Sequence, residues 1–332
     1  MASFSRIILS TGAFVCLIPT GLTGCKTTGN DSSGTATQPP FVSAVASPSP
    51  QSADDALAPE KTGGFDGKRA FAHVAKLVSF GPHPSGSPAI AQVQEYLLSE
   101  LKSYGCSVET DAFSSDTPAG RLPMKNILVK IPGDKPGVIL LGTHYDTKKL
   151  DNFVGADDGG SSTGVMLELA RLLCTQHGRY AAWIAFFDGE EAVKDWSETD
   201  SRYGSRQMAA RLAISGDISK IRAFLLADIV GTRAPHFKRE SSSTKWLVDL
   251  IWRAARNLGY ANIFVDESAP IDDDHDPFLK RNVPSADVID LDREHDVPYW
   301  HTPQDTLDKI SARSLAIVGH VFLESVKQLQ AK

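Results

Sequence analysis

The chain has 332 residues, of which 42% are hydrophobic, 22% charged and 8% aromatic, and its formal net charge is −6. This composition is typical of a globular protein with a sizeable core, and it argues against a wholly disordered chain or a membrane bundle. Because no block of lysines or arginines stands out, the sequence also argues against a nucleic-acid partner. The four cysteines form no Cys-x-x-Cys pair, so any metal site is expected to use histidine and carboxylate side chains.

The amino-terminal region is predicted to direct export. Residues 1–25 contain an apolar run from Ile7 to about Ile18 and end in Leu-Thr-Gly-Cys, which resembles a bacterial lipobox. The run is too short to span a bilayer. We therefore expect a signal peptide that ends at a lipidated Cys25, which anchors the chain at the periplasmic face of the cell envelope and is its only membrane contact. Lys26 stands where aspartate is associated with inner-membrane retention, which favours the outer membrane.

Composition then separates a tether from one folded domain. Residues 26–64 are rich in Ser, Thr, Pro, Ala and Gly and lack apolar periodicity, which predicts a disordered tether. Residues 65–332 fit one large domain. Their short apolar runs alternate with segments of helical period, which predicts an α/β fold with an open, mostly parallel, twisted sheet flanked by helices.

Three apolar runs are predicted to be strands that are buried on both faces. They cover residues 138–141, 182–187 and 224–227. Polar residues follow the three runs directly: His144, Glu190, Glu191 and Asp228. Since ligands of open α/β sheets bind beyond the carboxyl ends of the strands, we expect these side chains to converge at one edge.

Two helices are predicted from their apolar spacing. One helical face carries Val165, Leu169, Leu172 and Leu173 behind Ser161 and Ser162, which can cap the helix. This helix would cross over between the first two strands. Residues 305–328 repeat apolar side chains at roughly helical spacing and are expected to form a closing helix.

The candidate chemistry lies in carboxylates and histidines, since no serine-nucleophile elbow, dinucleotide-binding glycine motif or Walker loop occurs. The candidates are His144, Asp146, Asp158, Glu190, Glu191, Asp228, Asp273, Asp274, His275 and His301. Zinc prefers such nitrogen and oxygen ligands and keeps an open position when it is catalytic. In the adjacent pair, one glutamate can ligate zinc while the other carries protons. Two adjacent glutamates usually form a solvated loop, but clustered strand-end acids favour a cation.

The order of these motifs resembles that of the co-catalytic zinc aminopeptidases over essentially all of residues 65–332. The motifs are His144-Tyr145-Asp146, Gly155-Ala156-Asp157-Asp158, Asp188-Gly189-Glu190-Glu191, Asp228 and His301. Within that superfamily the chain is more similar to the glutaminyl-peptide cyclotransferases. Three separated blocks carry this likeness: residues 188–206 with Trp196, residues 271–279 with Ile271 and Asp273, and Trp300-His301-Thr302.

The resemblance implies an enzyme that converts the N-terminal glutamine of peptides and proteins to pyroglutamate and releases ammonia. The implied ligands of a single Zn²⁺ are Asp158, Glu191 and His301. Glu190 is implied to be the proton carrier, with Asp228 and Asp273 in an acidic network beside it. The implied walls of the pocket for the glutamine side chain are Trp196, Ile271 and Trp300. Zinc would polarise the γ-amide carbonyl while the peptide's own α-amine attacks.

Other interpretations stay open. The second-metal positions of the aminopeptidases are matched here by His144 and Asp228, with Asp146 as a further ligand or a supporting residue. A dizinc aminopeptidase is therefore the alternative enzyme. A non-catalytic binding domain is a third possibility, because this fold also occurs in receptors that have lost their metal ligands. Cys106 and Cys174 could pair in an oxidising envelope or remain free thiols. Nothing in the sequence specifies the oligomeric state.

Overall fold

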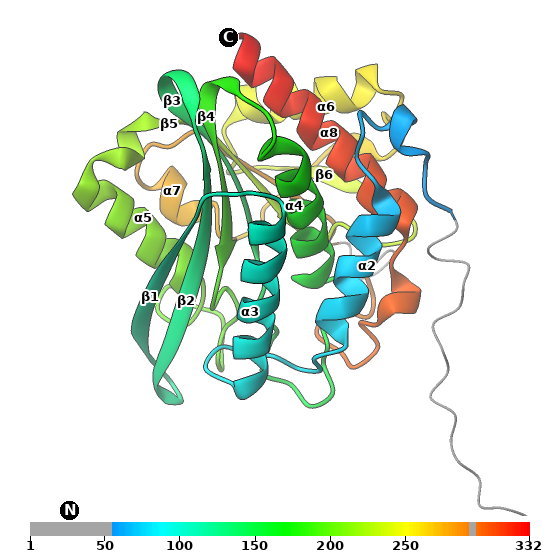
Figure 1. Ribbon diagram of the computed structural model, residues 1–332. Helices are drawn as coiled ribbons and strands as arrows, with labels where there is room; N and C mark the ends of the chain where they lie inside the picture. Colours follow the sequence, from blue (N-terminus) through cyan, green and yellow to red (C-terminus); the bar gives the residue numbers. More distant parts are fainter. Residues whose placement is uncertain (1–54, 292–296) are drawn as a thin grey trace, which may run out of the picture. The chain divides into compact units, whose positions relative to one another are not determined.

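The computed structural model describes residues 55–291 and 297–332 (Figure 1). The predicted signal peptide, the predicted lipidation site Cys25 and residues 26–54 of the predicted tether lie outside these residues. In the part of the chain that is described, no helix is long and apolar enough to cross a membrane.

The structure describes residues 55–64, which lie before the expected start of the folded domain at residue 65. Helix η1 covers Pro59–Lys61. The carboxylate of Asp55 accepts a hydrogen bond from Ser311 Oγ at 2.7 Å, and the buried hydroxyl of Thr62 donates to the carbonyl of Phe65 at 2.6 Å. Polar contacts therefore hold residues 55–64 against the domain, and the apolar periodicity used to place the boundary does not register such contacts.

A six-stranded sheet forms the centre of the domain, with its strands in the order β1-β2-β4-β3-β5-β8. The strands are β1 (Val108–Thr117), β2 (Gly120–Ile131), β3 (Gly133–His144), β4 (Gly178–Phe187), β5 (Ile221–Asp228) and β8 (Ser285–Ile289). Strands β4, β3, β5 and β8 run parallel, whereas β1 and β2 form an antiparallel edge. This topology confirms the predicted α/β class. A small parallel sheet joins β6 (Phe237–Glu240) to β7 (Phe264–Ala269).

Helices cover both faces of the central sheet (Figure 1). One face carries α2 (Gly67–Val78), α3 (Pro88–Ser103), α4 (Gly160–Leu173) and α8 (Ala312–Ala331), with α6 (Lys245–Asn257) packed in the same hydrophobic cluster. The other face carries α5 (Tyr203–Ser215) and the short α7 (Asp276–Leu279). Single turns η2 (Asp217–Lys220) and η3 (Leu307–Lys309) complete the described helices.

The three predicted strands lie within β3, β4 and β5, and their side chains divide between the two layers. On β3, Ile139 and Leu141 pack into the cluster beneath α2, α4 and α8, whereas Val138 and Leu140 pack beneath α5. All four side chains are at most 3% exposed. Because both faces are covered, an uninterrupted apolar run is what a central parallel strand requires.

Two helix starts differ from the prediction. Helix α4 begins at Gly160 after Gly159, so Ser161 and Ser162 lie inside the helix and do not cap it. Gly159 has φ +77°, and a Cβ there would lie 2.8 Å from His144 Cε1, which leaves room only for glycine. The closing helix starts at Ala312 rather than at residue 305, because Ser311 Oγ accepts hydrogen bonds from the first backbone N–H groups of α8.

Cys106 and Cys174 form a disulfide, with their Cα atoms 5.2 Å apart. The bond links the segment before β1 to the carboxyl end of α4. Of the two possibilities that the sequence left open, the structure therefore has the disulfide and not two free thiols.

Candidate active site

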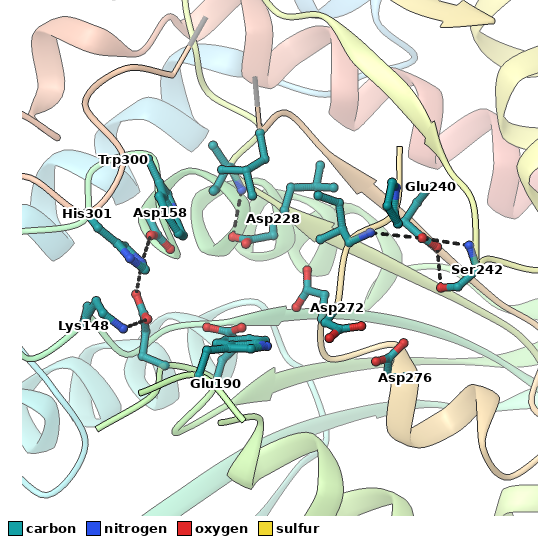
Figure 2. Close-up of a pocket in the computed structure, with 18 of the residues that line it drawn as sticks. Lys148, Asp158, Glu190, Asp228, Glu240, Ser242, Asp272, Asp276, Trp300 and His301 are labelled. Carbon is teal, nitrogen blue, oxygen red and sulfur yellow. Dashed lines mark hydrogen bonds and ion pairs between the residues drawn. The ribbon is translucent and has the colours of Figure 1, made fainter. Parts of the chain in front are cut away.

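The carboxyl ends of β3, β4 and β5 meet at a cavity of about 670 Å³. His144 is the last residue of β3 and Asp228 the last of β5, while Glu190 and Glu191 follow β4. Figure 2 shows Asp158, Glu190, Asp228 and His301 around the same cavity. Nine predicted site residues line it: Asp158, Glu190, Glu191, Trp196, Asp228, Ile271, Asp273, Trp300 and His301.

Asp158, Glu191 and His301 form a group with the spacing of metal ligands, because their ligand atoms lie within 4.8 Å of one another. His301 Nε2 is 3.1 Å from Glu191 Oε1 and 3.2 Å from Asp158 Oδ2. One ring nitrogen carries at most one proton, so it cannot donate to both carboxylates. Asp158 Oδ2 is buried and makes no hydrogen bond. A divalent cation between the three side chains would satisfy all of them, and the donor set suits zinc.

The charges of this group are strongly coupled to one another. Burial alone would lower the pKa of His301, but the neighbouring carboxylates of Asp158 and Glu191 raise that pKa to about 9. Burial opposes the charge of Asp158 as well, yet the neighbouring imidazoles of His144 and His301 bring the pKa of Asp158 well below its ordinary value. These neighbours favour the ionised form of Asp158.

A second group shares Asp158 with the first. It consists of His144, Asp158 and Asp228, whose ligand atoms also lie within 4.8 Å of one another. His144 Nε2 is 3.3 Å from Asp158 Oδ1 and 3.1 Å from Asp228 Oδ1. The chain thus brings together the ligand types for two adjacent cations that share one aspartate.

Asp146 contacts residues of both groups without lining the cavity. Its two carboxylate oxygens accept hydrogen bonds from the backbone N–H groups of Glu190 at 3.1 Å and Glu191 at 3.3 Å. Asp146 Oδ1 also lies 3.6 Å from His144 Nδ1. Neither group of described residues with ligand spacing includes Asp146. Of its two predicted roles, the structure therefore favours that of a supporting residue.

Glu190 lies beside the cation ligands without belonging to either group. Its side chain is 6% exposed and faces the cavity. Burial raises the pKa of Glu190 well above its ordinary value, and the charges of Glu191 and Asp273 add to this against the opposing charge of His144. A carboxyl group in this environment can hold a proton and give it up to a neighbouring group.

Asp273 is another buried carboxyl group that lines the same cavity. Its Oδ1 accepts a hydrogen bond from the backbone N–H of Asp274, while its Oδ2 is buried without a partner. Burial and the charge of Asp228 raise the pKa of Asp273 to about 7. Burial also raises the pKa of Asp228 itself, although His144 opposes this. The structure thus brings Asp228 and Asp273 to the same cavity as Glu190 and couples their charges.

Asp274 and His275, which were also candidates, are fully buried and do not line the cavity. His275 Nε2 instead lies 3.1 Å from Glu240 Oε2. Although burial opposes it, the hydrogen bonds from His275 and from the backbone of Ser242 lower the pKa of Glu240 to about 2. Glu240 Oε1 then accepts the backbone N–H of Ile271 at 3.3 Å. This buried pair holds the segment that carries Ile271 against the cavity.

The predicted pocket walls differ in exposure and packing. Trp300 stacks on His301, with ring centroids 3.7 Å apart and an interplanar angle of 18°. Figure 2 shows the two rings side by side at the cavity. Trp196 is 41% exposed. Ile271 is partly buried against the cluster of Ile229, Ile289 and Val297.

Three further residues contact the site and were missed by sequence reasoning. Lys148 Nζ lies 3.3 Å from Glu191 Oε2. Asp305 accepts hydrogen bonds from the backbone N–H groups of Asp157 at 2.8 Å and Asp158 at 3.0 Å, and the hydroxyl of Tyr299 donates to Asp157 at 2.7 Å. Two of them had an available signal: Lys148 follows the His144-Tyr145-Asp146 motif by two residues, and Tyr299 directly precedes Trp300.

Backbone strain is concentrated at the same place. His301 has φ +52°, and Ile229, which directly follows Asp228, has φ +45°. Such values are costly for residues with a side chain, above all for a β-branched one, and persist only where the surrounding structure enforces them. The backbone is thus held in a strained conformation at His301 and directly after Asp228.

Comparison with known proteins agrees with this geometry. Residues 126–326 match Peptidase family M28. The glutaminyl-peptide cyclotransferase of Boiga irregularis is 32% identical, and the match covers 74% of this chain and 77% of that protein. The chain belongs to the glutaminyl-peptide cyclotransferases of peptidase family M28. This confirms the family resemblance inferred from the motifs.

Solved structures give the same assignment. An Acidobacteriales bacterium glutaminyl cyclase superposes with a TM-score of 0.76 and 41% identity, over 80% of this chain and 95% of the other. A Zn-dependent exopeptidase from Parabacteroides distasonis superposes with a TM-score of 0.71 and 30% identity, over 78% of this chain and 97% of the other. The family and the second of these neighbours are consistent with zinc as the metal.

Proposed function

We propose that this cyclotransferase converts the N-terminal glutamine of peptides and proteins to pyroglutamate and releases ammonia. The observation that carries the proposal is the arrangement of Asp158, Glu191 and His301 around one cation position, with the buried carboxyl group of Glu190 next to it. The names of the relatives support the same activity.

Asp158, Glu191 and His301 would hold the zinc ion, which when bound polarises the carbonyl of the substrate's γ-amide. The chain's own residues then orient the reactants and move a proton. The attacking α-amine belongs to the substrate itself, so the reaction needs orientation more than activation of a nucleophile. Trp196, Ile271 and Trp300 line the cavity and would enclose the glutamine side chain.

Glu190 would accept the proton that leaves the α-amine as the ring closes, and return it to the departing ammonia. Its location satisfies both steps because it faces the cavity next to the proposed ligand Glu191. We expect Glu190→Gln to keep its zinc, because the amide is similar in size and Glu190 is not a ligand. Turnover should fall by about 10²- to 10⁴-fold, the usual contribution of a positioned acid–base group. Near-normal ammonia release by a zinc-loaded variant would exclude this role.

A dizinc aminopeptidase is the second candidate, and one specific observation favours it. His144 and Asp228 form a second group with ligand spacing that shares Asp158 with the first. In this alternative, both groups hold zinc and Glu190 activates a water molecule that cleaves the N-terminal residue. The cyclotransferase proposal instead uses one zinc ion, with His144 and Asp228 bonded to each other.

One experiment separates the two candidates. The purified domain is incubated with a Gln-initiated and a Leu-initiated peptide of otherwise equal sequence, and both are followed by mass spectrometry. The zinc content of the same sample is measured by elemental analysis. Cyclisation gives a blocked peptide that has lost the mass of ammonia and leaves the Leu peptide intact. Shortening of the Leu peptide, with two zinc ions per chain, would overturn the cyclotransferase proposal.

We also propose that the chain is exported and anchored in the cell envelope through a lipid on Cys25. The apolar run and the lipobox-like Leu-Thr-Gly-Cys sequence support this proposal. Expression in a bacterial host with a radioactive fatty acid should label the parent and leave Cys25→Ala unlabelled. An unlabelled parent would refute the anchor without affecting the enzymatic proposal.

A further inference from the structure

Arg202 is a buried arginine that the proposed mechanism does not use. It directly precedes α5, and its side chain is only 2% exposed. Its backbone adopts φ +51°, the left-handed conformation that most residues avoid. A buried guanidinium must be paired, because leaving its charge uncompensated away from water is costly. Its partners therefore indicate what this strained residue does.

The guanidinium of Arg202 joins two segments that line the cavity. One N–H group lies 2.5 Å from Asp276 Oδ2, at the start of α7. The guanidinium carbon lies 5.3 Å from the ring centroid of Trp196, within the range of a cation–π contact. Asp276 and Trp196 both line the cavity. Arg202 thus lies between the loop after β4 and the segment that follows Ile271.

The loop that carries Trp196 has a fixed backbone but an open side chain. Asp200 accepts hydrogen bonds from the backbone N–H groups of Val193, Lys194 and Asp195, which holds the loop in place. Trp196 itself is 41% exposed, so burial alone does not define its orientation. The contact with the guanidinium of Arg202 can restrain the ring in one orientation.

The backbone of Arg202 also contacts the catalytic segment. Its N–H donates to the carbonyl oxygen of Glu190 at 2.7 Å. The strained conformation of Arg202 is therefore tied to the proposed proton carrier, and its side chain extends from there toward the pocket wall. This connection fixes the distance between the wall and the reacting groups.

We propose that Arg202 is a positioning residue that holds the Trp196 ring at the mouth of the cavity and so sets the affinity for the substrate's terminal glutamine. The inference rests on the proposed function, because it assigns Trp196 to the glutamine pocket. It predicts that Arg202 affects KM through Trp196, with little direct effect on the chemical step.

A double-mutant cycle tests the coupling between the two side chains. Arg202→Met is made in the parent and in Trp196→Ala, and KM and kcat are measured from ammonia release with a Gln-initiated peptide. In the parent, KM should rise about fivefold, the size of one cation–π contact, with kcat changed by less than about twofold. In the Trp196→Ala background, the same substitution should change KM by less than about twofold. An equal rise in both backgrounds, or no rise in the parent, would overturn the inference.

Controls separate this effect from loss of structure. Lys245 Nζ lies 2.6 Å from Asp249 Oδ2 in an exposed ion pair at the start of α6, and neither residue lines the cavity, so Lys245→Met should leave KM unchanged. If Arg202→Met does not fold, the cycle is run with Arg202→Lys. That variant keeps a positive charge beside Asp276 but lacks the planar guanidinium over the ring. With it, KM should still rise about threefold in the parent background only.

A spectroscopic readout keeps the inference testable apart from the activity. The fluorescence of Trp196 is taken as the difference between each protein and its Trp196→Phe version. In Arg202→Met, the fluorescence anisotropy of Trp196 should decay faster than in the parent, because the ring has lost its restraint. If the parent releases no ammonia from Gln peptides, the proposed function fails, and the anisotropy still decides whether Arg202 restrains the ring. Unchanged anisotropy would overturn the inference.

Discussion

Replacing Asp146 with asparagine should perturb Glu190 and Glu191 together. The carboxylate holds the backbone N–H groups of Glu190 and Glu191 at 3.1 and 3.3 Å, and it faces His144 Nδ1 at 3.6 Å. Asparagine has nearly the same shape but offers one acceptor oxygen instead of two. Its amide group would therefore point at one of the two backbone N–H groups and leave it without a partner.

The expected cost follows from these contacts. Asp146 is only 1% exposed, so the orphaned N–H group gains no hydrogen bond from solvent. A hydrogen bond to a charged group contributes about 1.5–3 kcal/mol, and we expect the free energy of unfolding to fall by about 2–3 kcal/mol. Because Glu191 would shift with its backbone, zinc affinity should fall by about 10- to 100-fold.

Two measurements check this expectation. The free energy of unfolding comes from a urea titration of the metal-free proteins, and zinc affinity from competition with a chromophoric chelator. Asp116→Asn is the matched control, because the side chain of Asp116 is 86% exposed and lies on the β1 edge of the sheet. An Asp146→Asn variant with the parent's zinc affinity and stability would refute the assignment of Asp146 as the residue that orients the Glu190-Glu191 pair.

Three other expectations follow from the structure. Replacing both Cys106 and Cys174 with serine removes a disulfide between residues 68 positions apart. The free energy of unfolding, measured by urea titration, should fall by about 2–4 kcal/mol, and an unchanged midpoint would contradict this expectation. Alanine at Gly319 would place a Cβ 2.3 Å from the ring of Phe65 and should cost about 1–3 kcal/mol in thermal unfolding, whereas a parent-like Tm would show that the ring can move aside. Zinc added to chelator-stripped protein should raise stability by about 4 kcal/mol at a thousandfold excess over Kd, and a Tm independent of zinc would argue against the metal site.

The parts of the fold that were predictable from sequence are those in which local pattern and burial agree. The runs in β3, β4 and β5 are apolar at successive positions because helices cover both faces of the sheet. Parallel strands bring their carboxyl ends to one edge, so the convergence of His144, Glu190 and Asp228 followed from the strands alone. The order of the motifs then identified the family.

The features that were missed depend on partners far away in the sequence. Asp305 was placed inside a helix, yet its carboxylate binds backbone N–H groups 147 and 148 residues away. The start of α4 was misplaced because close approach to His144 requires Gly159, which the apolar spacing of the helix does not reveal. The edge strand β1 alternates partly buried and exposed side chains and lacks the continuous apolar run that marked the central strands.

The position of His301 and Asp305 near the carboxyl terminus has a consequence for biogenesis. Both residues lie in the segment that leads into α8, the last helix of the chain. A nascent polypeptide that had already formed β3, β4 and β5 would display the strand-end carboxylates, but it would lack the imidazole of His301 and the carboxylate that holds the Asp158 backbone. The proposed zinc site therefore cannot be complete before the segment around His301 has been synthesised and folded onto the strand ends. A truncation before residue 300 would abolish it even if the sheet survived intact.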